Sequence, residues 1–291
     1  MNPFSNTYNS DASDRELFKR IKEGDKNSLN TLISRHQPFI YNIAWKMTGD
    51  SVTAEDLSQE ALLKIISNLG SFKHKSSFRT WAYRIVRNHF LNDTKKPSPL
   101  FSTKFKELGD RLDAIENIQL SIEDQMAKAE EIREVRLQCL SGMLLCLTKE
   151  QRIIYIIGEV FGADHNIGSE IMDISKANYR MKLSKSRKDL QNFMLNKCGL
   201  VNKANPCRCH KKVTIAIETK MINAKNLLFN KKKFSTFKEA LEEDANTLVN
   251  KSDQIYVELH RDNSFKTDFD KKNFIAMLLE SKDWRARLHL N

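Results

Sequence analysis

The segment from Phe78 to Phe90 contains residue types that can grip an unpaired nucleic-acid strand. Tyr83, Arg84 and Arg87 lie off the apolar side that its helical spacing predicts. An aromatic ring can stack on an unpaired base while guanidinium groups hold the phosphate backbone. The segment therefore predicts a contact with single-stranded nucleic acid, and a solvated basic helix face is the alternative.

A second basic segment has the order of a helix-turn-helix. Thr148 begins one helix, residues 166–172 form a short one, and Ser175 is a good N-cap for a long basic helix. The second helix of such a motif enters the major groove of DNA. A basic helical hairpin that packs internally is the alternative. The residues that would face base edges and phosphates are Ser175, Lys176, Ala177, Asn178, Arg180, Met181, Lys182 and Lys185.

Four soft metal ligands follow this helix, within thirteen residues. They are Cys198, Cys207, Cys209 and His210. Four such ligands are enough for one tetrahedral zinc ion, so zinc is the candidate cofactor. Because the spacing is not the usual paired Cys-x-x-Cys, redox sensing and ordinary packing thiols stay open as alternatives.

The amino-acid composition limits the kinds of secondary structure that can position the basic and Cys-containing segments. Nine Gly and five Pro in 291 residues are too few for a turn-rich β-sandwich or barrel, and 40% hydrophobic residues can form a core. We therefore expect an all-α fold. The longest purely apolar run, residues 274–279, spans six residues, far below the ~20 that a membrane helix needs. Because the polar N-terminus also lacks a signal-peptide pattern, we expect no membrane insertion and a cytoplasmic location.

The net charge of +11 is placed unevenly along the chain. Residues 175–212 carry eleven Lys and Arg against one Asp, and residues 72–96 carry seven against one. Between these blocks, residues 107–136 hold nine acidic and four basic residues. Two basic blocks joined by an acidic connector suit two nucleic-acid contacts, held apart by a spacer that does not itself bind phosphate.

An acidic face precedes the first basic block. The apolar stripe from Leu57 to Leu69 predicts a helix, and Asp56, Gln59 and Glu60 lie away from that stripe. The helix dipole accounts for acidic residues in a first turn. Since Gln59 and Glu60 lie one turn further in, a protein-binding face is the alternative interpretation.

Together these segments resemble a known family. Residues 54–61 and 76–88, whose second run reads Ser-Ser-Phe-Arg-Thr-Trp-Ala-Tyr-Arg-Ile-Val-Arg-Asn, resemble region 2 of bacterial RNA polymerase sigma factors of the extracytoplasmic-function (ECF) class. Residues 147–152, Leu-Thr-Lys-Glu-Gln-Arg, with residues 174–190, are similar to their region 4. The region 2 pair is specific in order and spacing, and the region 4 match is looser.

The resemblance implies four parts in the chain. A helical region 2 domain would span residues 14–96, a flexible acidic linker 97–139, and a helix-turn-helix region 4 domain 140–196. A Cys-containing segment and a small, mostly helical extension would fill residues 197–291, with a regulatory role. A sigma factor of this kind binds RNA polymerase core, reads the minus-35 and minus-10 promoter elements and promotes DNA opening.

The resemblance also assigns roles to residues. Asp56, Gln59 and Glu60 match the positions that dock sigma factors onto the polymerase core. Promoter DNA and an anti-sigma factor are the other implied partners. The residues implied for the minus-10 strand are Phe72, Lys73, His74, Lys75, Ser76, Arg79, Tyr83, Arg84, Arg87 and Asn88.

Enzyme chemistry finds no support in the sequence. Neither basic block holds a cluster of acids or histidines for metal-dependent chemistry, and no phosphate-binding glycine loop is present. We therefore expect a protein without catalytic activity, and a stand-alone helix-turn-helix regulator is the alternative function. Several residues are unusual for region 4, namely Gly168, Ser169, Asp173, Tyr179 and Met181.

Overall fold

The computed structural model describes Phe4, residues 11–92 and residues 104–227. Eleven α-helices, one 3₁₀ turn and one π turn make up these residues, and their β structure is limited to one isolated bridge between Cys198 and Cys207. The all-α prediction is therefore confirmed. No helix in this described part is long and apolar enough to cross a membrane.

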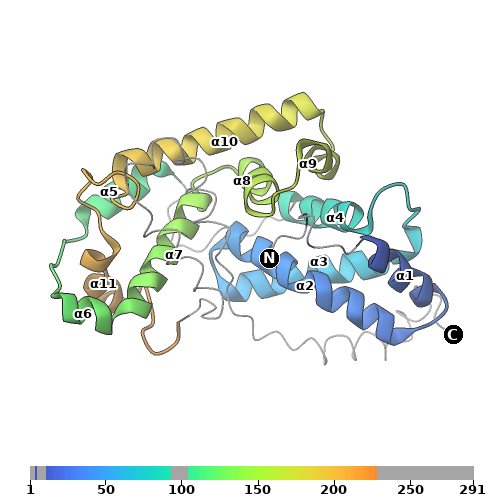
Figure 1. Cartoon of the computed structure of the whole chain (residues 1–291), viewed down its shortest axis with the longest axis horizontal. Coiled ribbons are helices and arrows are strands. Elements are labelled where there is room, and N and C mark those ends of the chain that lie inside the picture. Colours follow the sequence, from blue (N-terminus) through green and yellow to red (C-terminus); the bar gives the residue numbers. More distant parts are fainter. Residues whose placement is uncertain (1–3, 5–10, 93–103, 228–291) are drawn as a thin grey trace.

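The first group of helices forms one half of the molecule in Figure 1. It contains α1 (Asp11–Lys22), α2 (Lys26–Thr48), α3 (Ser51–Ser67), the 3₁₀ turn η1 (Leu69–Ser71) and α4 (Phe78–Asn92). The carboxylate of Asp25 accepts hydrogen bonds from two amides at the start of α2, and Gly49 ends α2 in the left-handed conformation. Aspartate caps and a terminal glycine thus fix where these helices start and stop.

A side-chain cap sets the start of α3, and packing keeps α2 continuous through a proline. The cap of α3 is Asp50, whose carboxylate accepts a hydrogen bond from the Thr53 amide at 2.7 Å. The helix α2 runs through Pro38. Residues on both sides of Pro38 are buried, so packing outweighs the one hydrogen bond that proline removes.

The predicted flexible linker is mostly helical where the structure describes it. It forms α5 (Phe105–Ala114), α6 (Ile122–Ala127) and much of α7 (Ala129–Leu145). The buried Lys212 Nζ donates to the backbone oxygen of Leu112 at 3.0 Å and also to that of Ile115. This part of the linker thus packs against helices much later in the chain.

The helix-turn-helix prediction is confirmed. It consists of α8 (Lys149–Tyr155), which continues as the π turn η2 (Ile156–Val160), then α9 (His165–Met172) and α10 (Lys176–Lys197). Thr148 and Gln151 form the predicted capping box, and the Ser175 hydroxyl accepts from the amide of Asn178. These local signals position α10 along the edge of the molecule (Figure 1).

A last described helix, α11 (Cys209–Glu218), packs on α7. Residues 213–217 lie within this helix, where Val213 and Ala216 share one buried face. The two groups of helices share one continuous core, whose largest fully buried side chains include Tyr41, Trp45, Tyr83, Tyr155 and Tyr179.

Candidate nucleic-acid interface

Three aromatic or basic residues predicted to touch the minus-10 strand lie in the core. Tyr83 is fully buried, and its ring packs edge-on against Phe4 and Phe161, at centroid distances of 5.3 and 6.1 Å. Phe72 and Arg79 are also buried. In this conformation, none of the three can receive a base or a phosphate.

The loop between α3 and α4 presents its charged residues to solvent. Lys73, His74 and Lys75 are exposed, and Ser76 is half-buried. His74 adopts a positive φ of 55°, a conformation that favours turns. The buried ring of Phe72 packs against three aromatic rings, and so anchors this basic loop to the fold.

The two predicted arginines of α4 point at α9. Arg84 Nε and Nη2 donate to the backbone oxygen of Glu170 at 3.1 and 3.0 Å. Arg87 Nε donates to the backbone oxygen of Ile171 at 3.0 Å. Burial lowers the pKa of Arg87, and the nearby Asp173 raises it. Asn88, the last predicted residue on this helix, is exposed.

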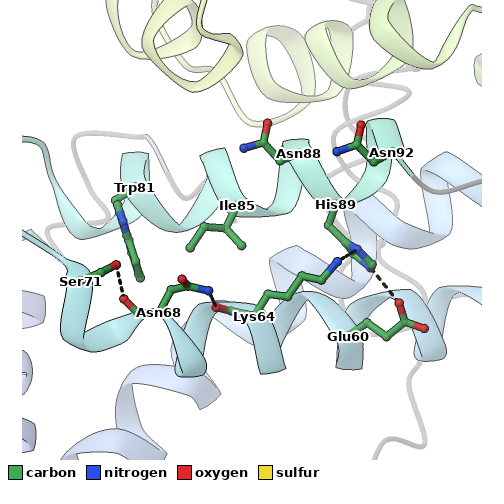
Figure 2. A pocket seen from close by; sticks show the side chains of 9 residues that line it. All are labelled: Glu60, Lys64, Asn68, Ser71, Trp81, Ile85, Asn88, His89 and Asn92. Atoms are coloured by element: carbon green, nitrogen blue, oxygen red, sulfur yellow. Dashed lines mark hydrogen bonds and ion pairs between the residues drawn. The ribbon is translucent and has the colours of Figure 1, made fainter. Parts of the chain in front are cut away.

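A pocket of about 480 Å³ lies between α3 and α4. Figure 2 shows Trp81, Ile85 and His89 pointing from α4 toward α3. Lys64 Nζ lies 2.8 Å from His89 Nδ1, and Glu60 Oε2 lies 3.4 Å from His89 Nε2. The remaining lining residues are Asn68, Ser71, Asn88 and Asn92.

Sequence reasoning missed most of this pocket. Trp81 and Ile85 lie on the apolar side of α4, yet both are only half-buried and form a pocket wall. The pair Asn88 and Asn92, one helical turn apart, was a usable signal because amides at this spacing share a face. Nothing in the sequence around Lys64 indicated that this residue would line the pocket.

The predicted polymerase-binding residues lie together on α3. Asp56 and Glu60 are exposed and Gln59 is half-buried, while Leu57 and Ala61 on the other side of the helix are buried. Because Asp50 caps the helix, Asp56 is not part of a capping box. Glu60 also lines the pocket, so the acidic face and the pocket adjoin.

The predicted minus-35 residues lie at the start of α10, mostly in solvent. Lys182 is half-buried and forms an ion pair with Glu150 at 2.6 Å. Asn178 is also half-buried. The exposed residues are Ser175, Lys176, Ala177, Arg180, Met181 and Lys185.

The geometry of the helix-turn-helix accounts for several of the residues that are unusual for region 4. A Cβ atom at Gly168 would lie 2.2 Å from Cζ of the buried Tyr179, and one at Gly158 would lie 2.8 Å from the Tyr179 hydroxyl. The tyrosine therefore requires glycine at both places. Asp173 takes the left-handed conformation, with φ 54°, that glycine would otherwise supply.

The predicted zinc ligands do not form a metal-binding group. Among the residues that the structure describes, no three His, Cys, Asp or Glu side chains could hold a metal ion together. Burial raises the pKa of Cys198 to about 11 and also raises that of Cys207. Burial, with Lys211 next, lowers the pKa of His210. In the absence of a metal ion, such thiols stay protonated at neutral pH.

Comparison with known proteins agrees with the region 2 residues. Residues 32–97 match the family "Sigma-70 region 2". The RNA polymerase sigma-H factor of Pseudomonas aeruginosa is 33% identical over 88 residues, and the ECF sigma factor SigW of Bacillus subtilis is 31% identical over 85. Each match covers 29% of this chain and 46% of the relative, so the chain spans about half the length of these two relatives.

A longer match reaches the helix-turn-helix. The ECF sigma-E factor of Escherichia coli is 24% identical over 190 residues, which is 62% of this chain and 93% of that protein. Among solved structures, CnrH in complex with the cytosolic domain of CnrY covers 62% of this chain and 96% of its own, with 15% identity and a TM-score of 0.45. Over region 2 and, at lower identity, as far as the helix-turn-helix, the chain is similar to RNA polymerase sigma factors of the ECF class.

Proposed function

We propose that this protein is a promoter-recognition subunit of bacterial RNA polymerase that acts in the cytoplasm. It binds the polymerase core, reads the minus-35 and minus-10 elements and promotes opening of the DNA, with no catalytic chemistry of its own. The observation that carries the proposal is the region 2 match at residues 32–97, because it contains both the acidic face of α3 and the basic loop before α4.

The acidic face of α3 is the proposed contact with polymerase core. Asp56, Gln59 and Glu60 are accessible on one side of a helix whose other side is buried. Acidic residues near a helix start usually stabilise its first turn. These three residues do not have that role, because the cap and the first turn of α3 are formed by other residues. A basic surface on the partner would complement them.

The pocket between α3 and α4 is the proposed site for an unpaired base of the minus-10 strand. Trp81 and Ile85 form an apolar wall against which a base can pack, and Asn68 adds an amide that can bond a base edge. Lys73 and Lys75 in the adjoining loop are exposed for phosphate contacts. Opening a duplex leaves such unstacked bases, and a pocket that holds one favours the open state.

The start of α10 is the proposed contact with minus-35 duplex DNA. Lys176, Arg180 and Lys185 are exposed on a helix that follows the turn of a helix-turn-helix. Basic side chains at the N-terminal end of such a helix reach base edges and phosphates in the major groove. An anti-sigma factor is a further proposed partner, since it would compete for these same surfaces.

The double variant Gln59→Ala with Glu60→Ala tests the polymerase contact. We expect its dissociation constant for purified polymerase core to rise at least about tenfold, because interface hot spots typically cost more than 1 kcal/mol. Alanine favours helix, so α3 should stay folded. Fluorescence anisotropy with labelled protein measures the affinity.

The matched control is Glu218→Ala, which makes the same change in net charge at the exposed end of α11. It should bind core like the wild type. If the wild-type chain binds duplex DNA but shows no affinity for core, the protein is a stand-alone helix-turn-helix regulator and the proposed function is wrong.

A further inference from the structure

We propose that Cys198 and Cys207 form a reversible intramolecular disulfide bond when the chain meets hydrogen peroxide. Cys198 follows the end of α10 and Cys207 lies just before α11, so the bond would close the loop between the two helices (Figure 1). In a reducing compartment such a bond would be transient, as is typical of redox-sensing cysteines. This oxidation site lies outside the surfaces proposed for polymerase and promoter, and its chemistry does not depend on the proposed function.

The backbone already holds the two cysteines side by side. They pair in the parallel β bridge, in which the Gly199 amide donates to the Cys207 backbone oxygen at 3.1 Å. Paired β residues lie about 4.8 Å apart, within the Cα separation of about 4.4 to 6.8 Å that a disulfide requires. Both side chains are half-buried, so neither thiol is sealed in the core.

Side chains in the loop between the cysteines fix its closed form. Asn205 Nδ2 donates to the backbone oxygen of Cys198 at 3.2 Å. Arg208 Nη2 donates to the backbone oxygen of Lys203 at 2.7 Å, and its Nη1 donates to that of Cys207 at 3.1 Å. Because the two ends of the loop are ordered before any reaction, an intramolecular bond between them is favoured.

Gly199 allows the close approach of the two backbone segments. A Cβ atom at this position would lie 2.3 Å from the Cys207 backbone oxygen, which is the acceptor in the bridge. The same atom would also clash with the Arg208 guanidinium group. A larger residue at position 199 would therefore separate the two cysteines without removing a thiol.

A small pocket gives an oxidant access to this site. Cys207 lines the pocket together with Cys139 and Cys209, and the other lining residues are mostly apolar side chains of α5, α7 and α11. The pocket volume is about 110 Å³. A water molecule takes about 30 Å³ in the liquid, so a molecule as small as hydrogen peroxide fits.

Hydrogen peroxide can oxidise the pair in two balanced steps. The thiolate of Cys207, which lines the pocket, attacks one peroxide oxygen, breaks the O–O bond, forms a sulfenic acid and releases hydroxide. The thiolate of Cys198 then attacks the sulfenic sulfur, forms the S–S bond and expels a second hydroxide. These hydroxides take up the two thiol protons. Two thiols and one peroxide thus become one disulfide and two water molecules.

Peptide mapping of the full chain tests the bond directly. Trypsin cleaves after residues 197, 203 and 208, so Cys198, Cys207 and Cys209 fall on three different peptides. Peroxide is added at about pH 8.5, because burial raises the pKa of Cys207 and its thiolate is scarce at neutral pH. Free thiols are then blocked with N-ethylmaleimide in urea. Mass spectrometry should find peptides 198–203 and 204–208 joined, and dithiothreitol should separate them.

Gly199→Ala is the most specific variant, because it keeps every thiol. It should lower the yield of the joined peptides at least about tenfold, since the cysteines lose their alignment. Gly70→Ala, where a Cβ meets nothing within 4 Å, is the matched control and should react like the wild type. Cys207→Ser should abolish the joined peptides, and Cys146→Ser, whose thiol does not line the pocket, should keep them.

The melting temperature gives a second readout. Oxidation should raise it by about 5 °C, because the bond constrains a loop of the unfolded chain. Dithiothreitol should reverse the rise, and Cys207→Ser should not show it. An absence of joined peptides in the wild type, a bond to Cys139 or Cys209 in place of Cys198, or equal yields from Gly199→Ala and Gly70→Ala would overturn the proposal.

Discussion

Alanine at position 168 is expected to destabilise the helix-turn-helix by about 3 kcal/mol, within the upper range for an overpacked core. The new methyl carbon would lie 2.2 Å from Cζ and 2.3 Å from the hydroxyl of Tyr179, a buried ring with little room to move. Helix propensity acts in the opposite direction, since alanine is favoured over glycine by about 1 kcal/mol. The clash costs more stability than the helix propensity of alanine adds, so the substitution should be destabilising overall. Urea unfolding followed by circular dichroism measures the change.

The control for this prediction is Gly70→Ala. Nothing lies within 4 Å of a Cβ at Gly70, so the stability of this variant should change little. Adding Tyr179→Leu to Gly168→Ala should recover much of the loss, because the smaller side chain frees the space. Equal stabilities of the two single alanine variants would show that Gly168 and Tyr179 are not in contact.

The second large effect is expected at Arg152, whose replacement with methionine should cost about 4 kcal/mol, since several buried carbonyl groups lose their donor. The buried guanidinium donates to the backbone oxygens of Leu144, Leu145 and Leu147, each at 2.9 Å. It also donates to that of Met47 at the end of α2. Burial lowers the pKa of Arg152 to about 10, so the group stays charged at neutral pH.

Arg152 thus links the ends of α2 and α7 to α8, and its loss should affect both helix groups. Arg152→Lys should recover only part of the stability, because a lysine ammonium has three donors and lacks the planar fork. Arg15→Met, at an exposed position on α1, is the matched control and should be close to neutral. Thermal unfolding of the three variants provides the test, and a melting temperature of Arg152→Met equal to that of Arg15→Met would disprove this role.

The sequence predicted best those features that depend on local signals. The side chains of Thr148 and Ser175 each accept from an amide only three residues away, so the start of each helix could be predicted from the sequence. The buried face of α10 also follows from spacing alone, because Tyr179, Leu183 and Leu190 recur at helical period.

Features that depend on contacts with distant segments could not be predicted from the sequence. Tyr83 lies off the apolar stripe of its own helix and is buried because Phe4 and Phe161 pack against it from elsewhere in the chain. Trp81 shows the converse, since it lies on the stripe but faces a pocket. Residues 104–139 likewise form helices because they contact α11. The spacing of apolar residues within this segment does not reveal those contacts.

Run-off transcription with purified polymerase core, on genomic fragments from the source organism, tests the central claim most directly. The wild type should produce promoter-specific transcripts, and Arg84→Ala with Arg87→Ala should abolish them, because the minus-10 strand loses its two guanidinium contacts. Arg15→Ala with Lys19→Ala, which removes two exposed charges from α1, should transcribe like the wild type. An absence of promoter-specific transcripts with the wild type, or full transcription by the Arg84 and Arg87 variant, would contradict the account.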